Sequence, residues 1–488
     1  MVVGLCAYAA IFIINPLNKE VKMKKVLIFV VVLIVAVAVI GPKFVGSQLK
    51  DGIQNTVDVI NKNPTYTASI KRLESTWFTT TAEISVGLYM PELAGQEAID
   101  ASIDLSVTSH HGPILTADGL ALAWLHTVVQ TQNIDIPDSV VVANNKPLYQ
   151  FTGITNLFGS TAYDDEVAAI NYTEPQSGGI VSFSGLQGKG EISSSGLTYK
   201  AAIDNLNMAV ENAANFDLQS FSVTFTSSES LTGMMSKGLY DSNSSMSVDL
   251  ITFNDIAQGT EVRIVDTKIV ARSDYDKPTD LGNVEVITTL ASLDATDMNL
   301  TDLSATLELN NLQARFLLAY QDFSNQIMAN INDPVKIEDD LQAFMQEYLL
   351  AQLQAKPEYN ISKLSGKING SEFDGKIMAK IDGVTDIPKT LDDPAFWMQH
   401  TVLDSKIVMQ KGAAEFIAAQ VISSQLAANP QFLALSEEEQ AQILAQQIPA
   451  TLSGLVQQGL ITLEEETYTS IFTMENGAAM LNGNPIPL

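Results

Sequence analysis

Polar and apolar residues alternate with a period of two through much of the chain, from about residue 69 to residue 309. In residues 82–89, for example, Ile84, Val86 and Leu88 are separated by polar or small residues. The same alternation recurs in residues 101–107, 221–225, 246–250 and 303–309. Because successive side chains of a strand point to opposite faces, each segment predicts a strand with one apolar and one polar face. Such strands are typical of antiparallel sheets.

A helical period replaces this alternation after the long run of strands. Apolar residues recur every three or four positions through residues 312–327, which predicts a helix with one apolar face. Asp333 and Pro334 then supply a cap and a proline for the first turn of a second helix, which we expect to end before Pro357. The spacing therefore predicts a helical hairpin.

A second pair of helices is predicted over residues 411–447, closer to the C-terminus. Ser436 and Glu439 have the spacing of a capping box, which favours a helix start at this point. Alternating segments lie between the two helical pairs and after the second. Asn476 and Gly477 separate the last of them and predict a tight β-hairpin.

The N-terminal region contains a run of fifteen residues without a polar side chain, Val26–Ile40, which Pro42 ends. Lys24 and Lys25 precede the run. We interpret it as a single transmembrane anchor, although it is shorter than the ~20 residues that usually cross a bilayer. A cleaved signal peptide is the competing interpretation, because its apolar region has a length of about 7–15 residues.

The orientation of the predicted anchor follows from its flanking charge. Basic residues mark the cytoplasmic side of a membrane span, so we expect a cytoplasmic N-terminus. The remainder of the chain would then lie outside the cytoplasmic membrane, which in a Gram-negative bacterium is the periplasm. The predicted localisation is therefore the bacterial inner membrane, with a single pass.

These patterns together predict a β-rich α+β fold, in which an anchor precedes an extended, curved antiparallel sheet with two inserted helical hairpins. The predicted parts are an extension over 1–22, which precedes the alternative start Met23, the anchor over 23–42, an amphipathic stalk helix over 43–63, a β-rich region over 64–310, a helical hairpin over 311–357, and strands with the second helical hairpin and a C-terminal β-hairpin over 358–488.

Composition narrows the class of function. The chain has 27 Lys and Arg against 56 Asp and Glu, a formal net charge of −29. This balance argues against a nucleic-acid partner, because phosphate contacts need clustered basic residues. One cysteine, Cys6, excludes a disulfide framework and any multi-cysteine zinc site.

Three motifs suggest chemistry, and each has a simpler structural interpretation. His110 and His111 are adjacent on a predicted strand, so they point to opposite faces and are poorly placed to share a metal ion. The sequence GLQGKG at 185–190 lacks the spacing and the final Ser or Thr of a phosphate-binding loop, so we predict a turn. Asp274, Asp276 and Asp280 meet only part of the calcium-loop pattern, so we predict a solvated loop.

The chain resembles the YdgA-like family of bacterial proteins, a domain-of-unknown-function group, from Met23 to Leu488. The resemblance is carried by the basic start and anchor, the segment TWFTTTAEISVGL from Thr76, an H-G-P step and a C-terminal N-G and L-N-G pattern. The motif residues, for which a structural role is expected, are His111, Gly112, Pro113, Asn476, Gly477, Leu481, Asn482 and Gly483. The resemblance implies an anchored periplasmic protein with no established activity.

No catalytic, cofactor-binding or metal-binding residues are predicted, and we expect the chain not to be an enzyme. The first interpretation of its function is a non-enzymatic binding, scaffolding or envelope-assembly factor. The alternative is a lipid-binding or lipid-transfer protein that uses an apolar groove of the sheet. Expected partners are the membrane through residues 26–40 and either a lipid or an envelope protein, and a homodimer is compatible with the sequence. Coverage of the apolar strand faces by the predicted helices discriminates between the two interpretations.

Overall fold

The computed structural model describes residues 42–486 apart from short gaps at 62–64, 91–98, 117–120, 133–138, 175–177, 212, 257–258, 330–332, 389–391, 428–431 and 433–434. The predicted extension over 1–22 and the predicted anchor at 26–40 lie outside the described residues. Among the helices of the described part, none combines the length and the hydropathy needed to cross a membrane.

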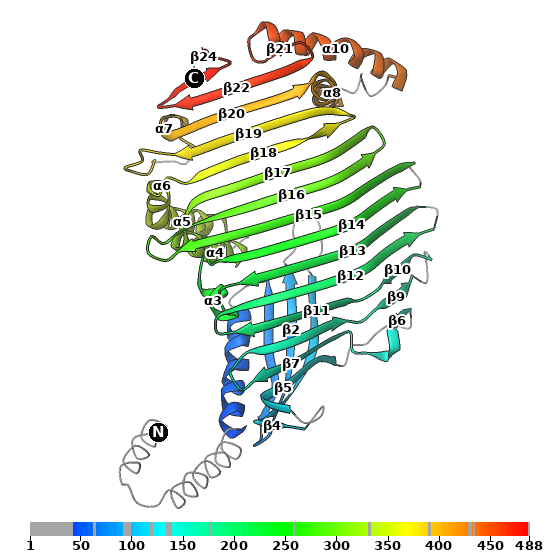
Figure 1. Cartoon of the computed structure of the whole chain (residues 1–488), viewed down its shortest axis with the longest axis vertical. Coiled ribbons are helices and arrows are strands. Elements are labelled where there is room, and N and C mark those ends of the chain that lie inside the picture. Colours follow the sequence, from blue (N-terminus) through cyan, green and yellow to red (C-terminus); the bar gives the residue numbers. More distant parts are fainter. Residues whose placement is uncertain are drawn as a thin grey trace, which may run out of the picture.

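One large antiparallel sheet dominates the structure (Figure 1). Its N-terminal strands are β1 (Tyr66–Ser75), β2 (Thr79–Met90), β3 (Ile99–His111), β4 (Ile114–Leu115), β5 (Ala121–Gln132), β6 (Val140–Val142), β7 (Tyr149–Asn156), β8 (Thr161–Val167), β9 (Ile170–Thr173), β10 (Ile180–Phe183), β11 (Leu186–Ser193) and β12 (Gly196–Val210). The strands that follow are β13 (Ala214–Ser227), β14 (Ser242–Asp255), β15 (Thr260–Asp276), β16 (Leu281–Ala295), β17 (Met298–Gln313), β18 (Glu358–Ile368), β19 (Ser371–Ile381), β20 (Thr401–Gln410), β21 (Thr462–Glu464), β22 (Thr467–Glu475), β23 (Ala478–Leu481) and β24 (Asn484–Ile486).

The strands pair mainly with their neighbours in the sequence. From β11 to β20 each strand pairs with the next one along the chain, and all of these pairs are antiparallel. The N-terminal part follows the order β1-β2-β3-β5-β7-β8-β11, while β6, β9 and β10 join along part of β12. The predicted β-rich fold with an extended antiparallel sheet is confirmed.

The helices lie at the ends of the strands (Figure 1). They are α3 (Leu231–Ser236), α4 (Ala314–Ala329), α5 (Pro334–Phe344), α6 (Leu350–Gln354), α7 (Pro394–His400), α8 (Lys411–Ala427) and α10 (Glu437–Gln457), with a short helix η1 (Ala143–Asn145) and a π-helical turn η2 (Met345–Leu349). Both predicted helical hairpins are present, since α4 packs against α5 and α8 packs against α10.

Several predicted boundaries differ from the structure. Strand β17 continues to Gln313, so Leu312 belongs to the sheet and not to the following helix. Helix α10 begins at the predicted capping box on Ser436, but it passes through Pro449 and ends ten residues after the predicted 447. The helices α3 and α7 were not predicted, because each has only six or seven residues and too few turns to show a period.

The predicted stalk helix is observed over residues 42–60, and it lies along the first strand of the sheet (Figure 1). Asn61 accepts a hydrogen bond from the backbone N–H of Ala68 (2.7 Å) and donates one to the carbonyl of Ala68 (2.8 Å). At the other end, Gly46 lies against His111 and Ser75. About 15 helical residues span ~22 Å and about 7 strand residues span ~23 Å, so the helix runs antiparallel to β1 over its length.

A line of left-handed residues crosses the central strands. Ser220, Asp266 and Asp302 have φ angles of 55°, 50° and 55°. They lie in one cross-strand row, in which Asp249 and Ala291 occupy the strands between them. All five side chains are exposed. The alternation of apolar positions shifts by one residue at this line, as at a bulge, so Ile203 and Leu206, or Leu303 and Leu300, stand three positions apart.

Candidate functional site

One face of the sheet is formed by two continuous rows of cross-strand neighbours. The first row, the Val107 row, comprises Ala82, Val107, Val129, Phe151, Asp165, Gly188, Ala201, Val223, Met246, Ile269, Thr288, Ala305, Leu364, Gly375, Ile407 and Ser470. Directly opposed residues share a face, so this row runs along one side of the sheet from β2 to β22.

The second row, the Tyr199 row, lies two residues away on the same face. It comprises Thr80, Ser109, Thr127, Gly153, Tyr163, Gly190, Tyr199, Phe225, Ser244, Ala271, Val286, Leu307, Ile361, Ile377, Ser405 and Phe472. We call the surface formed by the two rows the apolar face. At about 4.8 Å between strands, it is roughly 70 Å long.

The opposite face of the same strands is polar. The row between the two apolar rows carries Asp164, Lys189, Lys200 and Lys363 together with threonine and serine residues, and it also includes the apolar residues Val128, Val270 and Ile287. Lys189 forms an exposed ion pair with Asp164 (3.1 Å). The two faces therefore differ in charge as well as in hydropathy, as the alternation in the sequence predicts.

In the part of the chain that the structure describes, most of the apolar face has no second layer over it. The helices that pack extensively on the sheet contact its C-terminal strands: α4 and α6 contact β17, α8 contacts β18, β19, β20 and β22, and α7 contacts β22. Figure 1 shows the middle of the sheet as a single layer between these helices. Val223, Met246, Ile269, Val286 and Leu307 remain partly exposed. The predicted helices thus leave the central apolar face uncovered.

The C-terminal end of the apolar face leads to a hollow of about 300 Å³ between α8, α10 and strands β20 and β22. Its walls include Ile407 of the Val107 row and Met409 beside it, together with Ile417, Val421 and Leu452 from the helices. Val421 is half exposed at this hollow. The apolar surface therefore continues from the open sheet to a partly enclosed space.

The N-terminal end of the apolar face is closed by the helix over residues 42–60. His111 is 3% exposed, and its Nε2 atom lies 3.0 Å from Oγ1 of the fully buried Thr80. Burial lowers the pKa of His111 below its usual value. Its Nδ1 atom lies 3.4 Å from the carbonyl oxygen of Trp77. His111 thus has a packing position at the contact between helix and sheet.

Gly112 and Pro113, which follow His111, begin the segment that connects β3 to β5, and both are hydrogen-bonded to β5. The Gly112 N–H donates to the carbonyl of Trp124 (2.6 Å), and the Ala123 N–H donates to the carbonyl of Pro113 (3.1 Å). The Gly112–Pro113 peptide bond is cis. His110, by contrast, stacks on His126 of β5, with 6.4 Å between ring centroids. The adjacent histidines therefore have separate surroundings.

The C-terminal motif residues form two consecutive hairpins. Asn476 and Gly477 have positive φ angles between β22 and β23, and Asn482 and Gly483 have them between β23 and β24. Leu481 pairs with Phe472. The predicted hairpin is confirmed, and the second follows the same chemistry, since left-handed positions favour Asn and Gly.

The segment 185–190 is not a turn, so that prediction is wrong. Residues Leu186–Ser193 form strand β11, in which Gly188 and Gly190 lie beneath larger side chains. A Cβ atom on Gly188 would lie 2.0 Å from Oδ1 of Asp165, and one on Gly190 would lie 2.4 Å from the hydroxyl oxygen of Tyr163, so both would overlap with these side chains. The glycines are needed here for close packing within a strand, which a sequence pattern cannot distinguish from a turn.

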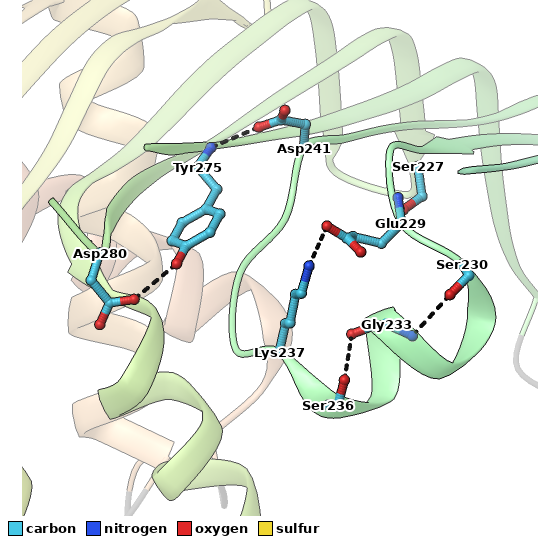
Figure 2. Close-up of polar contacts among 9 residues, drawn as sticks. All are labelled: Ser227, Glu229, Ser230, Gly233, Ser236, Lys237, Asp241, Tyr275 and Asp280. Atoms are coloured by element: carbon cyan, nitrogen blue, oxygen red, sulfur yellow. Dashed lines mark hydrogen bonds and ion pairs between the residues drawn. The ribbon is translucent and has the colours of Figure 1, made fainter. Parts of the chain in front are cut away.

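The acidic residues near 274–280 have separate partners. Asp274 accepts from Asn283 and Asp276 accepts from Thr279 (2.6 Å). Asp280 accepts from the Tyr275 hydroxyl (2.9 Å), and the Tyr275 N–H donates to Asp241 (2.8 Å), as Figure 2 shows beside α3. Among the described residues, no group of three or more His, Cys, Asp or Glu side chains has the geometry of a metal site.

Comparison with known proteins gives a family and nothing closer. The family model described as a bacterial protein of unknown function, DUF945, matches residues 23–488. No curated protein and no solved structure matches the chain. The match supports the predicted placement in a bacterial group of unknown function, while the finer YdgA-like identification stays a prediction.

Proposed function

The chain belongs to a bacterial protein family of unknown function, DUF945, and from that premise we propose that it binds the acyl chains of lipids on the apolar face of its sheet. The observation that carries this proposal is the centre of that face, where apolar residues of successive strands adjoin and none of the described helices lies above them. A large exposed apolar surface marks a binding site in a folded protein. Acyl chains suit it because they need no hydrogen-bond partner along its length.

The dimensions of the face support binding of more than one lipid. Between the N-terminal helix and the strands that α4, α6 and α8 contact, the face from β8 to β16 is roughly 30 Å long. The acyl chains of one leaflet have a length of about half of a ~30 Å hydrocarbon core. Several lipids could therefore lie side by side across the strands. The apolar hollow between α8 and α10 extends the same surface.

The predicted membrane anchor would hold the apolar face close to a membrane, which is a source of lipids. The helix over residues 42–60 follows directly after Val26–Ile40 and packs at the N-terminal end of the apolar face. We propose that residues 26–40 anchor the chain in the bacterial inner membrane and that the sheet lies on the periplasmic side. A reporter enzyme fused after Leu488 tests this: activity only outside the cytoplasm is expected, and activity only inside would refute it.

The lipid proposal is tested with two matched variants on one strand. Ile269 belongs to the apolar face, and its neighbour Val270 lies on the opposite face with similar size and similar partial burial. We expect Ile269→Asp to reduce the phospholipid that co-purifies in mild detergent several-fold, because a carboxylate among acyl chains is costly. Val270→Asp should leave the amount unchanged.

The measurement is mass spectrometry of lipid extracts per mole of the full chain, with circular dichroism to confirm that both variants fold. Wild-type protein without co-purifying phospholipid would refute the proposal, as would equal lipid in both variants. Such a result would favour the first interpretation from the sequence, a scaffold or assembly factor, in which a protein partner binds the apolar face. In either case we propose a binding protein and not an enzyme.

A further inference from the structure

One charged residue interrupts the apolar face. Across the sixteen positions of the Val107 row and the sixteen of the Tyr199 row, Asp165 is the single Asp, Glu, Lys or Arg. It lies on β8, near the N-terminal third of the face. A carboxylate in apolar surroundings costs free energy unless a partner stabilises it, so its position there calls for a partner.

Strand β11 is shaped to hold this carboxylate and the rings around it. Oδ1 of Asp165 is buried above Gly188, where a Cβ atom would clash with it. Oδ2 accepts a hydrogen bond from the Tyr199 hydroxyl (3.1 Å). The Tyr163 ring stacks on Tyr199 over Gly190, with 6.1 Å between ring centroids. Gly188 and Gly190 therefore leave the space that the Asp165 carboxylate and the Tyr163 ring occupy.

Of the four side chains in this cluster, the carboxyl group of Asp165 is the one that can carry a charge near neutral pH, because the other three are phenols with raised pKa values. Tyr149 lies two residues before Phe151 on β7 and therefore on the same face. Burial raises the pKa of Tyr149 to about 12 and also raises the pKa values of Tyr163 and Tyr199. These phenols therefore remain protonated and act as hydrogen-bond donors. Burial also raises the pKa of Asp165, which a bound cation would counteract.

Lys189 and Lys200, on the neighbouring strands β11 and β12, lie on the other face of the sheet. Lys189 pairs with Asp164 (3.1 Å), and Lys146 pairs with Glu166 (2.7 Å). Asp164 and Glu166 flank Asp165 in β8, so their side chains alternate to the face opposite to Asp165. Among the described residues of the two rows there is no Lys or Arg beside Asp165, so a cationic ligand on the apolar face would supply the missing positive charge.

We propose that Asp165, Tyr163, Tyr199 and Tyr149 form a headgroup site for a phospholipid that carries a primary ammonium group. The ammonium donates hydrogen bonds to the Asp165 carboxylate. The phosphate oxygens accept hydrogen bonds from the hydroxyls of Tyr163 and Tyr149, because the Tyr199 hydroxyl already donates to Asp165. The acyl chains then lie on the adjoining apolar face. This site rests on the proposed lipid binding and adds a preference among lipids to it.

The test measures which headgroups are bound, separately from how much lipid is bound. The full chain is incubated with vesicles of equal parts phosphatidylethanolamine and phosphatidylglycerol, re-isolated, and its lipid is identified by mass spectrometry. We expect wild-type protein to be enriched at least three-fold in phosphatidylethanolamine. Asp165→Asn keeps the side-chain shape and should bind the same total lipid in the supplied ratio.

Asp164→Asn is the matched control, because it removes the neighbouring carboxylate on the opposite face and should leave the enrichment unchanged. A second arm needs no variant: phosphatidylethanolamine with an N-acetylated headgroup has no ammonium and should not be enriched. Free ethanolamine in millimolar excess should not displace the lipid, which distinguishes a lipid site from a site for small amines.

The outcomes separate the two proposals. Wild-type protein that binds lipid without headgroup enrichment, or Asp165→Asn that keeps the enrichment, would overturn the headgroup site and leave lipid binding intact. Equal enrichment of the N-acetylated lipid would overturn it as well. Wild-type protein that binds no lipid at all would overturn both.

Discussion

Gly112 lies so close to Ala123 that a Cβ atom on the glycine would stand 1.5 Å from the Ala123 carbonyl oxygen. We expect Gly112→Ala to destabilise the protein by about 3 kcal/mol or more, because the obstacle is backbone and cannot move aside easily. Urea unfolding followed by circular dichroism measures this. Gly52→Ala is the control: nothing lies within 4 Å of that helical position, and a gain of about 0.5–1 kcal/mol is expected. Equal stabilities would show that the contact is not as close as described.

His111 should make the stability of the protein depend on pH. Its pKa is lowered in the folded state, so the unfolded chain binds more protons below the usual histidine value of about 6.5. The contribution of neutral His111 is fully present above pH ~6.5 and is lost as the pH falls from there toward the lowered pKa. Melting temperatures between pH 7.5 and 5.5 should drop more for wild-type protein than for His111→Gln. Parallel curves for the two proteins would contradict this.

Asp266 occupies one of the left-handed positions that cross the sheet. A β-branched residue has a steric cost in this conformation, so Asp266→Ile should destabilise the protein by about 1–2 kcal/mol. Asp266→Gly should stay within about 1 kcal/mol of wild type, because glycine adopts positive φ readily. Chemical denaturation compares the two. A larger loss for the glycine variant would mean that the side chain, and not the backbone, matters at this position.

Asn482 combines a left-handed backbone with two hydrogen bonds. It accepts from the Ile471 N–H (2.9 Å) and donates to the Gly459 carbonyl (2.9 Å). Asn482→Ala should cost about 2–3 kcal/mol, the sum of the backbone cost and two hydrogen bonds of about 1 kcal/mol each. Asn476→Ala has a matching φ angle and should cost about 1 kcal/mol. The difference between the two variants in thermal unfolding isolates the hydrogen bonds.

The sequence is a good guide wherever one side chain pattern decides the local structure. The alternation in residues 82–89 and 303–309 predicts the strands β2 and β17, the apolar spacing after Pro42 predicts the helix on β1, and Ser436 predicts the start of α10. These features depend on residues within a few positions of one another. Local spacing is therefore sufficient for them.

The candidate site depends on relationships between distant segments. Asp165 meets Gly188 and Tyr199 through the pairing of β8, β11 and β12, and no spacing along the chain indicates that meeting. The glycines of β11 read as a turn for the same reason. The exposure of the central apolar face likewise depends on where the helices pack against the sheet, and the sequences of the helices do not indicate those positions. An aspartate at an otherwise apolar strand position is the signal in the sequence that points to the proposed headgroup site.

The serial pairing of neighbouring strands has a consequence for how this architecture can vary. Because each strand from β11 to β20 bonds only to its predecessor and successor among these strands, the body is close to a one-dimensional stack. Excising one complete hairpin, such as β14 with β15, would bring two antiparallel-compatible edges together and shorten the molecule by about 10 Å. Duplication of a hairpin would lengthen the molecule by the same amount. Gene rearrangements that remove or add whole hairpins would therefore change the length of the sheet in steps of about 10 Å.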